Sequence, residues 1–249
     1  MTSENPVSRA AETATKSELR STWEKAAPGW AKWEKEFSAG LSAATDALID
    51  MAAIRPGMRV LDLACGAGNQ TIQTARRVGP SGRVVACDIS ATMLDHVRQN
   101  AAAANLRNIE TLESAAEDLD ERLLPFDAAI SRLGLMLFPS PGRALKALQR
   151  VLKSDARFAA LVFTTPDHNP FMARSMAVVL RCAGKSPPKP GQPGLFCPRS
   201  QRNFGRSDAG QRTCSDTDKA CDGIAQFTKR VSCLGDDARG LRCIPSGCC

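Results

Sequence analysis

The stretch Val60-Leu61-Asp62-Leu63-Ala64-Cys65-Gly66-Ala67-Gly68-Asn69-Gln70 decides the fold class of this 249-residue chain. Its apolar start predicts a short buried strand over residues 59–63, and the residues from Asn69 onward predict a helix over 69–77. Gly66 and Gly68 separate the two and allow a sharp turn that a ligand can approach closely. In doubly wound sheets such a turn borders the ligand crevice at the carboxyl ends of the strands.

The same alternation of strand and helix continues on both sides of this stretch. It indicates an α/β, Rossmann-like, doubly wound and mostly parallel sheet with helices on both faces. The further strands are expected at 83–87, 108–112, 126–131 and 158–163, and the further helices at 41–54, 91–104, 141–152 and 170–183.

Changes in composition predict how the chain is organised. Residues 1–40 are expected to hold a disordered N-terminus, up to residue 21, and then an amphipathic helix broken at Pro28-Gly29. Its tryptophans could stack on a planar substrate or cap a core. Residues 41–165 form the expected ligand-binding domain, and residues 166–196 form a substrate-side helix and a Pro-rich connection.

The last 53 residues, 197–249, differ from the rest because their apolar residues lack helical or strand spacing. They contain no histidine, and their cysteines lack the close pairs of a zinc site, so no metal is expected. We expect this tail to lack stable structure, and a shifted reading frame is one hypothesis for its origin. The C-terminal strands of the sheet would then be missing, and the strand at 158–163 would have no further neighbour. Seven of the ten cysteines lie here: Cys197, Cys214, Cys221, Cys233, Cys243, Cys248 and Cys249.

The second strand ends with an acid that narrows the choice of ligand. Asp88 stands 22 residues after Gly66, where a carboxylate can accept both ribose hydroxyls of an adenosyl group. The dinucleotide fingerprint requires a third glycine three residues after Gly68, and Thr71 stands there instead. The pattern therefore favours an adenosyl ligand other than a dinucleotide.

Two of these stretches resemble motifs of class I S-adenosylmethionine-dependent methyltransferases. Asp62-Leu-Ala-Cys-Gly-Ala-Gly68 resembles their first motif, and Asp88-Ile-Ser-Ala-Thr-Met-Leu94 resembles their acid-plus-helix motif. The resemblance covers about residues 22–196 and is greatest to the ubiquinone/menaquinone-biosynthesis C-methyltransferase group. It implies S-adenosylmethionine as the cofactor and a small molecule as the methyl acceptor.

The resemblance also implies which residues bind the cofactor. Ser114–Leu119 matches the family's adenine-binding segment, but Ala115 replaces its aspartate, so Glu117 or the backbone of Ala116 is expected to substitute. Phe126–Arg132 resembles the fourth-strand motif. The complete expected set is Asp62, Ala64, Gly66, Gly68, Asp88, Met93, Ala116, Glu117 and Ser131.

We therefore expect an enzyme that transfers a methyl group to a carbon or oxygen of a small molecule. His168, just past the fifth strand, is a candidate substrate contact or base. An RNA or protein methyltransferase is an alternative, supported by the net charge of +7. A second alternative is a non-catalytic S-adenosylmethionine-binding remnant, supported by Ala115, the weak turn Ser154-Asp155-Ala156 and the tail.

Composition restricts location and partners. No apolar run reaches the ~18 residues of a membrane span. Residues 1–21 lack the apolar centre of a signal peptide. No basic stripe is interleaved with aromatic residues, as a nucleic-acid surface would require. We expect a cytoplasmic protein with no membrane span and no specific nucleic-acid partner, of undetermined oligomeric state.

Overall fold

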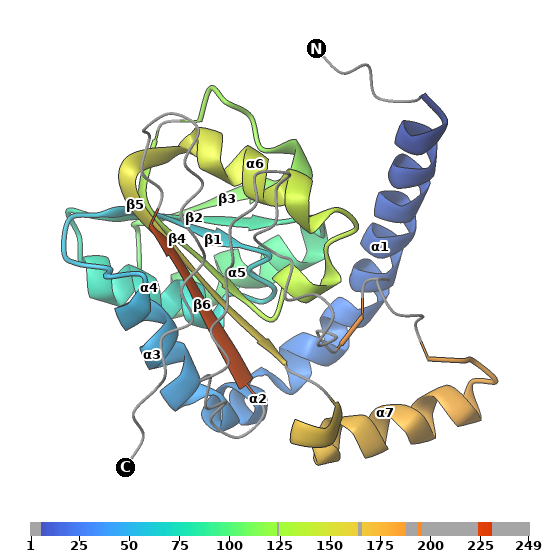
Figure 1. Ribbon diagram of the computed structural model, residues 1–249. Coiled ribbons are helices and arrows are strands. Elements are labelled where there is room, and N and C mark those ends of the chain that lie inside the picture. Colours follow the sequence, from blue (N-terminus) through green and yellow to red (C-terminus); the bar gives the residue numbers. More distant parts are fainter. Residues whose placement is uncertain (1–5, 124, 164–165, 188–193, 196–223, 231–249) are drawn as a thin grey trace.

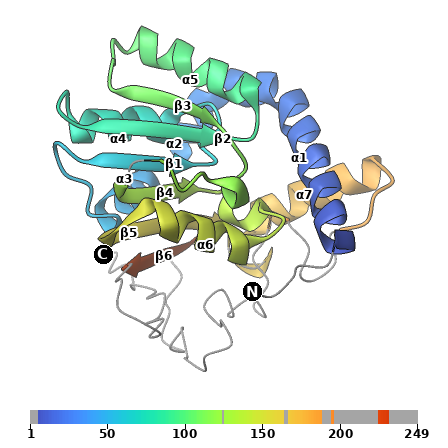
Figure 2. The ribbon, with the colours of Figure 1, turned by 90° about the horizontal axis from the view of Figure 1, so that it is seen from above.

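A computed structural model describes residues 6–123, 125–163, 166–187, 194–195 and 224–230 of the chain. Within these residues, six strands form one sheet in the order β3-β2-β1-β4-β5-β6 (Figures 1 and 2). The first five strands run parallel, and β6 is antiparallel to β5. The strands are β1 Arg59–Leu63, β2 Arg83–Asp88, β3 Ile109–Glu113, β4 Phe126–Arg132, β5 Leu152–Phe163 and β6 Ile224–Arg230.

The direction in which the chain builds the sheet reverses at β1. From β1 it proceeds outward through β2 to β3, and then returns to the other side of β1 to add β4 and β5. The carboxyl ends of β1 and β4 therefore border the crevice at which doubly wound sheets bind ligands. This is the crevice that the turn after Leu63 was expected to border.

Helices cover both faces of the sheet, as Figure 2 shows. On one face, α3, α4 and α5 pack against the strands, and on the other face α6 does. Side chains of successive strand residues point to opposite faces of the sheet. Leu61 packs in the cluster under α6, and Val60 packs in the cluster under α3 and α4. Burial on both faces explains the nearly continuous apolar strands. The helices are α3 Ser42–Met51, α4 Asn69–Val78, α5 Ala91–Ala103 and α6 Pro141–Val151.

The N-terminal segment differs from the sequence prediction. Residues expected to be disordered belong to α1, Pro6–Lys32, which also continues through Pro28 where a break was expected. A proline inside a helix removes one backbone hydrogen bond. Packing on both sides of it compensates, because Trp23, Ala27 and Trp30 contact one buried cluster with Met93. A second helix, α2 (Glu34–Gly40), follows directly.

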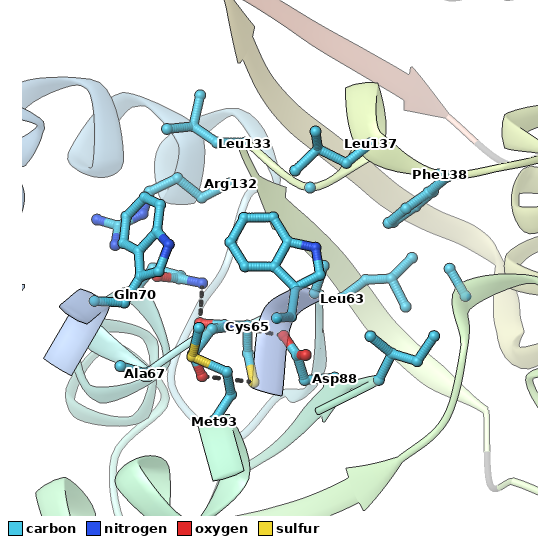
Figure 3. Close-up of a pocket in the computed structure, with 18 of the residues that line it drawn as sticks. Leu63, Cys65, Ala67, Gln70, Asp88, Met93, Arg132, Leu133, Leu137 and Phe138 are labelled. Atoms are coloured by element: carbon cyan, nitrogen blue, oxygen red, sulfur yellow. Dashed lines mark hydrogen bonds between the residues drawn. The ribbon is translucent and has the colours of Figure 1, made fainter. Parts of the chain in front are cut away.

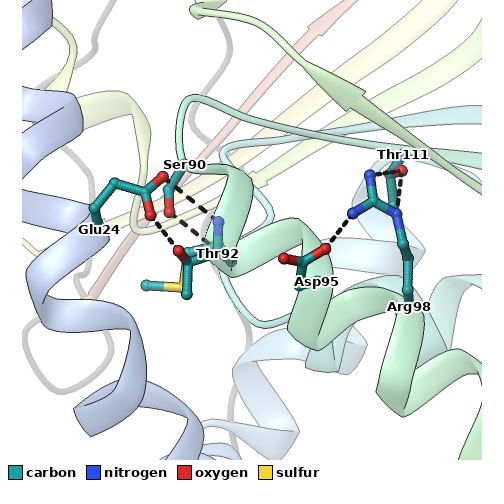
Figure 4. Close-up of polar contacts among 7 residues, drawn as sticks. Glu24, Ser90, Thr92, Asp95, Arg98 and Thr111 are labelled. Atoms are coloured by element: carbon teal, nitrogen blue, oxygen red, sulfur yellow. Dashed lines mark hydrogen bonds and ion pairs between the residues drawn. The ribbon is translucent and has the colours of Figure 1, made fainter.

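Polar contacts fasten α1 along the edge of the sheet. Figure 4 shows Glu24, whose carboxylate accepts the backbone N–H and the hydroxyl of Thr92 in the first turn of α5. One and two turns earlier, Arg20 pairs with Glu113 at 3.4 Å and Lys16 with Asp118 at 2.7 Å. A spacing of four residues places all three on one side of the helix. This side fixes α1 across the ends of β2 and β3.

The C-terminal strand β6 also differs from expectation, because β5 does have a second neighbour. The pairing runs from Arg157 opposite Arg230 to Phe163 opposite Ile224. An unpaired strand edge offers a row of hydrogen-bonding groups, and Ile224, Phe227 and Thr228 are residue types that favour strands. Residues 196–223 and 231–249 lie outside the described residues, and the shifted-frame hypothesis for them stays a prediction.

The segment expected as a weak turn before the fifth strand is also strand. Residues 154–156 belong to β5, which begins at Leu152 immediately after α6. The register between β4 and β5 shifts between Phe126 and Ala128, and this irregularity accommodates the early start. The remaining elements are the 3₁₀ helices η1 Ala116–Asp118, η2 Leu135–Leu137 and η3 Pro166–His168, and the helix α7 Pro170–Cys182.

Candidate functional site

Two glycines shape the turn between β1 and α4, and they do so for different reasons. Both have left-handed backbones, with φ of 55° at Gly66 and 90° at Gly68. A Cβ on Gly68 would lie 2.8 Å from Val97 of α5, so this glycine permits α4 and α5 to pack closely. A Cβ on Gly66 would meet nothing within 4 Å, because Gly66 faces the open pocket. Gly66 therefore leaves room for a ligand.

The carboxylate of Asp88 connects this turn to the start of α5. Its Oδ2 accepts the backbone N–H of Gly66 at 2.9 Å, and its Oδ1 accepts that of Ser90 at 3.0 Å. The hydroxyl of Ser90 in turn accepts the N–H of Met93 and caps α5. Burial raises the pKa of Asp88, against the lowering effect of these backbone bonds. Each carboxylate oxygen retains a lone pair for a further donor in the pocket.

Asp62 was expected to bind the cofactor, but it lies behind the turn and does not line the pocket. Its carboxylate accepts hydrogen bonds from the Thr71 hydroxyl and the Gln70 amide, which fixes the first turn of α4 on β1. Burial raises its pKa to about 6, although Thr71, Gln70 and the charge of Arg132 act in the opposite direction. In this structure Asp62 supports the turn.

The raised pKa of Asp62 predicts a pH dependence of stability. The folded chain keeps this proton up to about pH 6, whereas the unfolded chain releases it near its ordinary value of 3.8. The stabilisation is thus complete below about pH 4 and is lost as pH rises through about 6. Relative to Asp62→Asn, the unfolding free energy of the parent should fall by about 2–3 kcal/mol over that window.

Urea denaturation at several pH values checks this expectation. Asp88→Ala is unsuitable as a control, because burial raises the pKa of that carboxyl too. Asp46→Asn, at an exposed position on α3, is the matched control and should keep the parental pH dependence. A parental slope in Asp62→Asn would show that Asp62 ionises in the folded protein as it does in water.

A large pocket opens where these elements meet (Figure 3). It contains about 1030 Å³ free of protein atoms, including the part open to solvent. Its lining comes from the turn after β1, the end of β2, residues 114–117, the helices α1 and α2, and the segment after β4. Of the expected cofactor-binding residues, seven line it: Ala64, Gly66, Gly68, Asp88, Met93, Ala116 and Glu117.

Ser131 and His168 were expected at the site but do not line this pocket. Ser131 is fully buried behind Gly134, where an added Cβ would lie 2.9 Å from its hydroxyl oxygen. His168 is exposed in η3, the 3₁₀ helix that follows β5 in the chain. Glu117 does line the pocket, but its Oε1 already accepts the N–H of Ser140 at 3.0 Å. That bond ties η1 to the start of α6 and leaves Oε2 for a ligand.

The tryptophans of the N-terminal helix, for which substrate stacking and core capping were both left open, do not all lie at the pocket. Trp23 and Trp30 of α1 line it, whereas Trp33 is 59% exposed and does not. Two charged residues that line the pocket were not predicted, because they come from distant elements. Arg132 at the end of β4 and Glu34 at the start of α2 also line it. No sequence pattern pairs these two charges, which are 98 positions apart.

Strained backbone occurs beside the turn. Ala64 and Leu133 have φ of 57° and 61° although neither is a glycine, and both line the pocket. Such conformations cost about 1–3 kcal/mol and persist where the surroundings enforce them, often at binding sites.

In the described part of the chain, no group of three or more His, Cys, Asp or Glu side chains could hold a metal ion. Nor does any helix described there have the length and apolarity to cross a bilayer.

Comparisons with known proteins identify the family of the chain. The family model described as a methyltransferase domain matches residues 54–180, just over half of the chain. A 2-phytyl-1,4-naphtoquinone methyltransferase of Trichormus variabilis is 33% identical over 156 residues, covering 62% of this chain and 68% of that protein. A ubiquinone/menaquinone biosynthesis C-methyltransferase of Shewanella frigidimarina is 37% identical over 121 residues, 48% of each chain.

Among solved structures, a Bacillus halodurans protein described provisionally as a methyltransferase has a TM-score of 0.50 at 21% identity, over 64% of each chain. At that identity the likeness concerns the fold alone, and it confirms the Rossmann-like architecture. The chain spans about half the length of most curated relatives that it matches. The expected family is confirmed: this chain belongs to the methyltransferase-domain family, whose relatives include the quinone-biosynthesis methyltransferases.

Proposed function

We propose that the pocket binds S-adenosylmethionine, with its ribose on Asp88. The observation that carries the proposal is the position of this carboxylate: it ends β2, contacts the Gly66 turn and faces the pocket. A carboxylate so placed can accept two ribose hydroxyls in charge-assisted hydrogen bonds. The open space at Gly66 fits a ligand passing close to the backbone.

The adenine would lie on the β3 side of the ribose, against Ala115 and Ala116. Met93 of α5 contributes an adaptable apolar surface there. Ala115 offers no acceptor for the adenine amino group, so Oε2 of Glu117 and the backbone of Ala116 are the groups proposed to replace the missing aspartate.

The proposed reaction is methyl transfer to a small-molecule carbon or oxygen. When bound, the cofactor supplies the electrophilic methyl group. The residues of this chain hold the acceptor in line and exclude water, which can contribute roughly 7–11 kcal/mol at best. We propose a planar aromatic acceptor of the quinol type. Its support is the names of the relatives and the ring-lined wall formed by Trp23, Trp30 and Phe37.

A turnover assay tests the proposal. The chain is incubated with methyl-labelled S-adenosylmethionine and 1,4-naphthohydroquinone, and with total RNA in parallel. We expect labelled methylnaphthoquinol and S-adenosylhomocysteine with the parent, and a strongly reduced rate with Asp88→Ala. Labelled RNA would favour the RNA methyltransferase alternative. Tight cofactor binding with no methylation of any acceptor in a quinol, phenol and catechol panel would favour the non-catalytic alternative.

The cytoplasmic location and the small-molecule partner remain predictions of the sequence. The net charge of +7 is the sole support for a nucleic-acid partner. Binding that depends on charge alone weakens steeply with salt. We therefore expect the affinity for RNA to fall by a factor on the order of 10³–10⁵ between about 50 and 200 mM salt if the chain contacts about 6–10 phosphates.

A further inference from the structure

The helix α7 packs against little of the molecule. None of its residues is buried, and the described element that it contacts most is η3, the short helix just before it. In Figure 1, α7 lies apart from the sheet, beyond the end of β5. Helices in proteins are stabilised mainly by packing an apolar face against a core. The apolar side chains of α7 largely lack such packing within the described part of the chain.

Three large apolar side chains of α7 are exposed. Phe171 is 78% exposed, Val179 59% and Val178 48%, and elsewhere in the described part of the chain only Trp33 is a comparably exposed large apolar residue. Seven residues make about two helical turns, so Phe171 and Val178 lie on one line along the helix. The exposed large apolar side chains of the described residues are thus concentrated on one helix.

Positive charge borders this apolar face. Arg174 and Arg181 are exposed and also seven residues apart, on a line about 60° around the helix from that of Phe171 and Val178. Lys185 follows the helix, and the segment from the start of α7 up to this lysine contains no acid. Among the described residues, none of these three cations has a side-chain partner. The free face of α7 is therefore apolar and flanked by unpaired positive charge.

This combination of charge and apolar surface favours an anionic lipid surface as the partner. A helix with exposed apolar residues, flanking arginines and no acid lies in the interface of a bilayer, with its apolar side chains among the acyl chains. Long basic side chains then reach outward to the lipid phosphates. A second copy of the chain, docked by the same face, would offer arginines and no acid in return. The charge of α7 is complementary to lipid phosphate and not to itself.

We propose that α7 docks the protein on an anionic lipid surface, with Phe171, Val178 and Val179 inserted and with Arg174 and Arg181 at the lipid phosphates. The inference goes beyond the proposed function and does not depend on it, because neither a cofactor nor an acceptor enters the argument. The helix follows β5 at the carboxyl edge of the sheet, the edge at which the pocket lies. Docking through α7 therefore brings this edge of the molecule to the lipid.

Flotation of the full chain with lipid vesicles tests the proposal. Vesicles of phosphatidylcholine mixed with phosphatidylglycerol are anionic, and vesicles of phosphatidylcholine alone are neutral. The parent should float with the anionic vesicles and bind the neutral ones roughly tenfold or more weakly, since each cation near an anionic surface contributes about fivefold. The double variant Phe171→Ser/Val178→Ser should reduce binding to the anionic vesicles roughly tenfold or more, because it removes inserted apolar area. Arg174→Glu/Arg181→Glu should reduce it at least as much.

Two matched variants serve as controls. Trp33→Ser removes an exposed large apolar side chain outside α7, and Arg76→Glu/Arg107→Glu makes the same change in net charge at exposed positions elsewhere. At physiological salt each should change vesicle binding less than about twofold, because screening confines the effect of a charge to its surroundings. A parental far-UV circular dichroism spectrum shows that a variant is folded. If the apolar double variant fails this check, the arginine double variant decides.

Three outcomes would overturn the inference. The parent binds neither kind of vesicle, or the α7 variants bind no more weakly than their controls. In the third, the chain forms a concentration-dependent dimer that Phe171→Ser/Val178→Ser abolishes and does not bind vesicles, which assigns the face to a second copy. Binding of S-adenosylhomocysteine is measured separately, and its absence would contradict the proposed function while leaving the lipid result as it stands.

Discussion

Gly66→Val should abolish binding of S-adenosylhomocysteine while the chain remains folded. The added side chain meets no protein atom, because the space beside Gly66 is open and belongs to the pocket. A ligand lying against the turn would have to occupy that same space. The left-handed backbone at this position adds strain of about 1–2 kcal/mol to the folded state, which a stable domain tolerates.

The control for this variant is a second glycine with the same two properties. Gly79 also has a positive φ, 69°, and a Cβ there would meet nothing within 4 Å, but it lies after α4 and outside the pocket. The backbone of Gly79, with a ψ of −176°, lies in a region that essentially only glycine adopts, so Gly79→Val should lose at least as much thermal stability as Gly66→Val and leave binding unchanged. Far-UV circular dichroism and calorimetry give the two readouts. Parental affinity in Gly66→Val would place the ligand elsewhere.

Asp88→Ala should weaken binding of both S-adenosylhomocysteine and 5′-methylthioadenosine by about 1.5–3 kcal/mol, roughly 10- to 150-fold. Both ligands carry the ribose that the carboxylate is proposed to accept. The loss should therefore be shared by the two ligands. The substitution also leaves the N–H groups of Gly66 and Ser90 without their acceptor, so the turn itself should loosen.

The pH dependence of binding separates the loss of the ribose contact from the loosening of the turn. Binding requires the ionised Asp88, and burial raises the pKa of this carboxyl in the free protein. Affinity of the parent should therefore fall as pH falls through that raised pKa, and the fall should be smaller in Asp88→Ala. A parental pH dependence in the variant would assign the titration to another group, such as Glu34, whose pKa burial also raises.

The sequence predicted the parts of the site that one local pattern encodes. The strand, the two-glycine turn and the helix after it are contiguous, and Asp88 follows the next buried strand by the same rule. Topology alone then brings the ends of β1 and β2 together. Gly66 and Asp88 were therefore identifiable without coordinates, and their backbone hydrogen bond is the structural result of that rule.

The sequence could not distinguish the residues of the motif that support the turn from those that line the pocket. Asp62 and Gly66 are four positions apart, but a strand residue facing the packed helix is buried and a turn residue is exposed to the pocket. Ser131 was misjudged for the same reason. Arg132, its neighbour on β4, has the opposite orientation and lines the pocket. An error of one residue along a strand changes the face of the sheet.

The contribution of α1 was missed because its cause is tertiary. Residues before Thr22 show weak apolar periodicity, and their helix is held by partners far along the chain, such as Asp118 for Lys16. Composition predicted disorder there since no local signal reports a distant acid. The strand β6 was missed for a related reason: it pairs with the free edge of β5, and its own residues, Ile224–Arg230, do not alternate regularly between apolar and polar types.

The most direct test of the account is a calorimetric titration of the unmodified chain with S-adenosylhomocysteine, followed by NAD⁺ as a competitor. Thr71 stands where a dinucleotide site has its third glycine, and the pocket pairs a ribose acceptor, Asp88, with the charges of Arg132 and Glu34. The account predicts saturable one-to-one binding of S-adenosylhomocysteine that NAD⁺ does not displace. Tighter binding of NAD⁺, or no binding of S-adenosylhomocysteine, would contradict it.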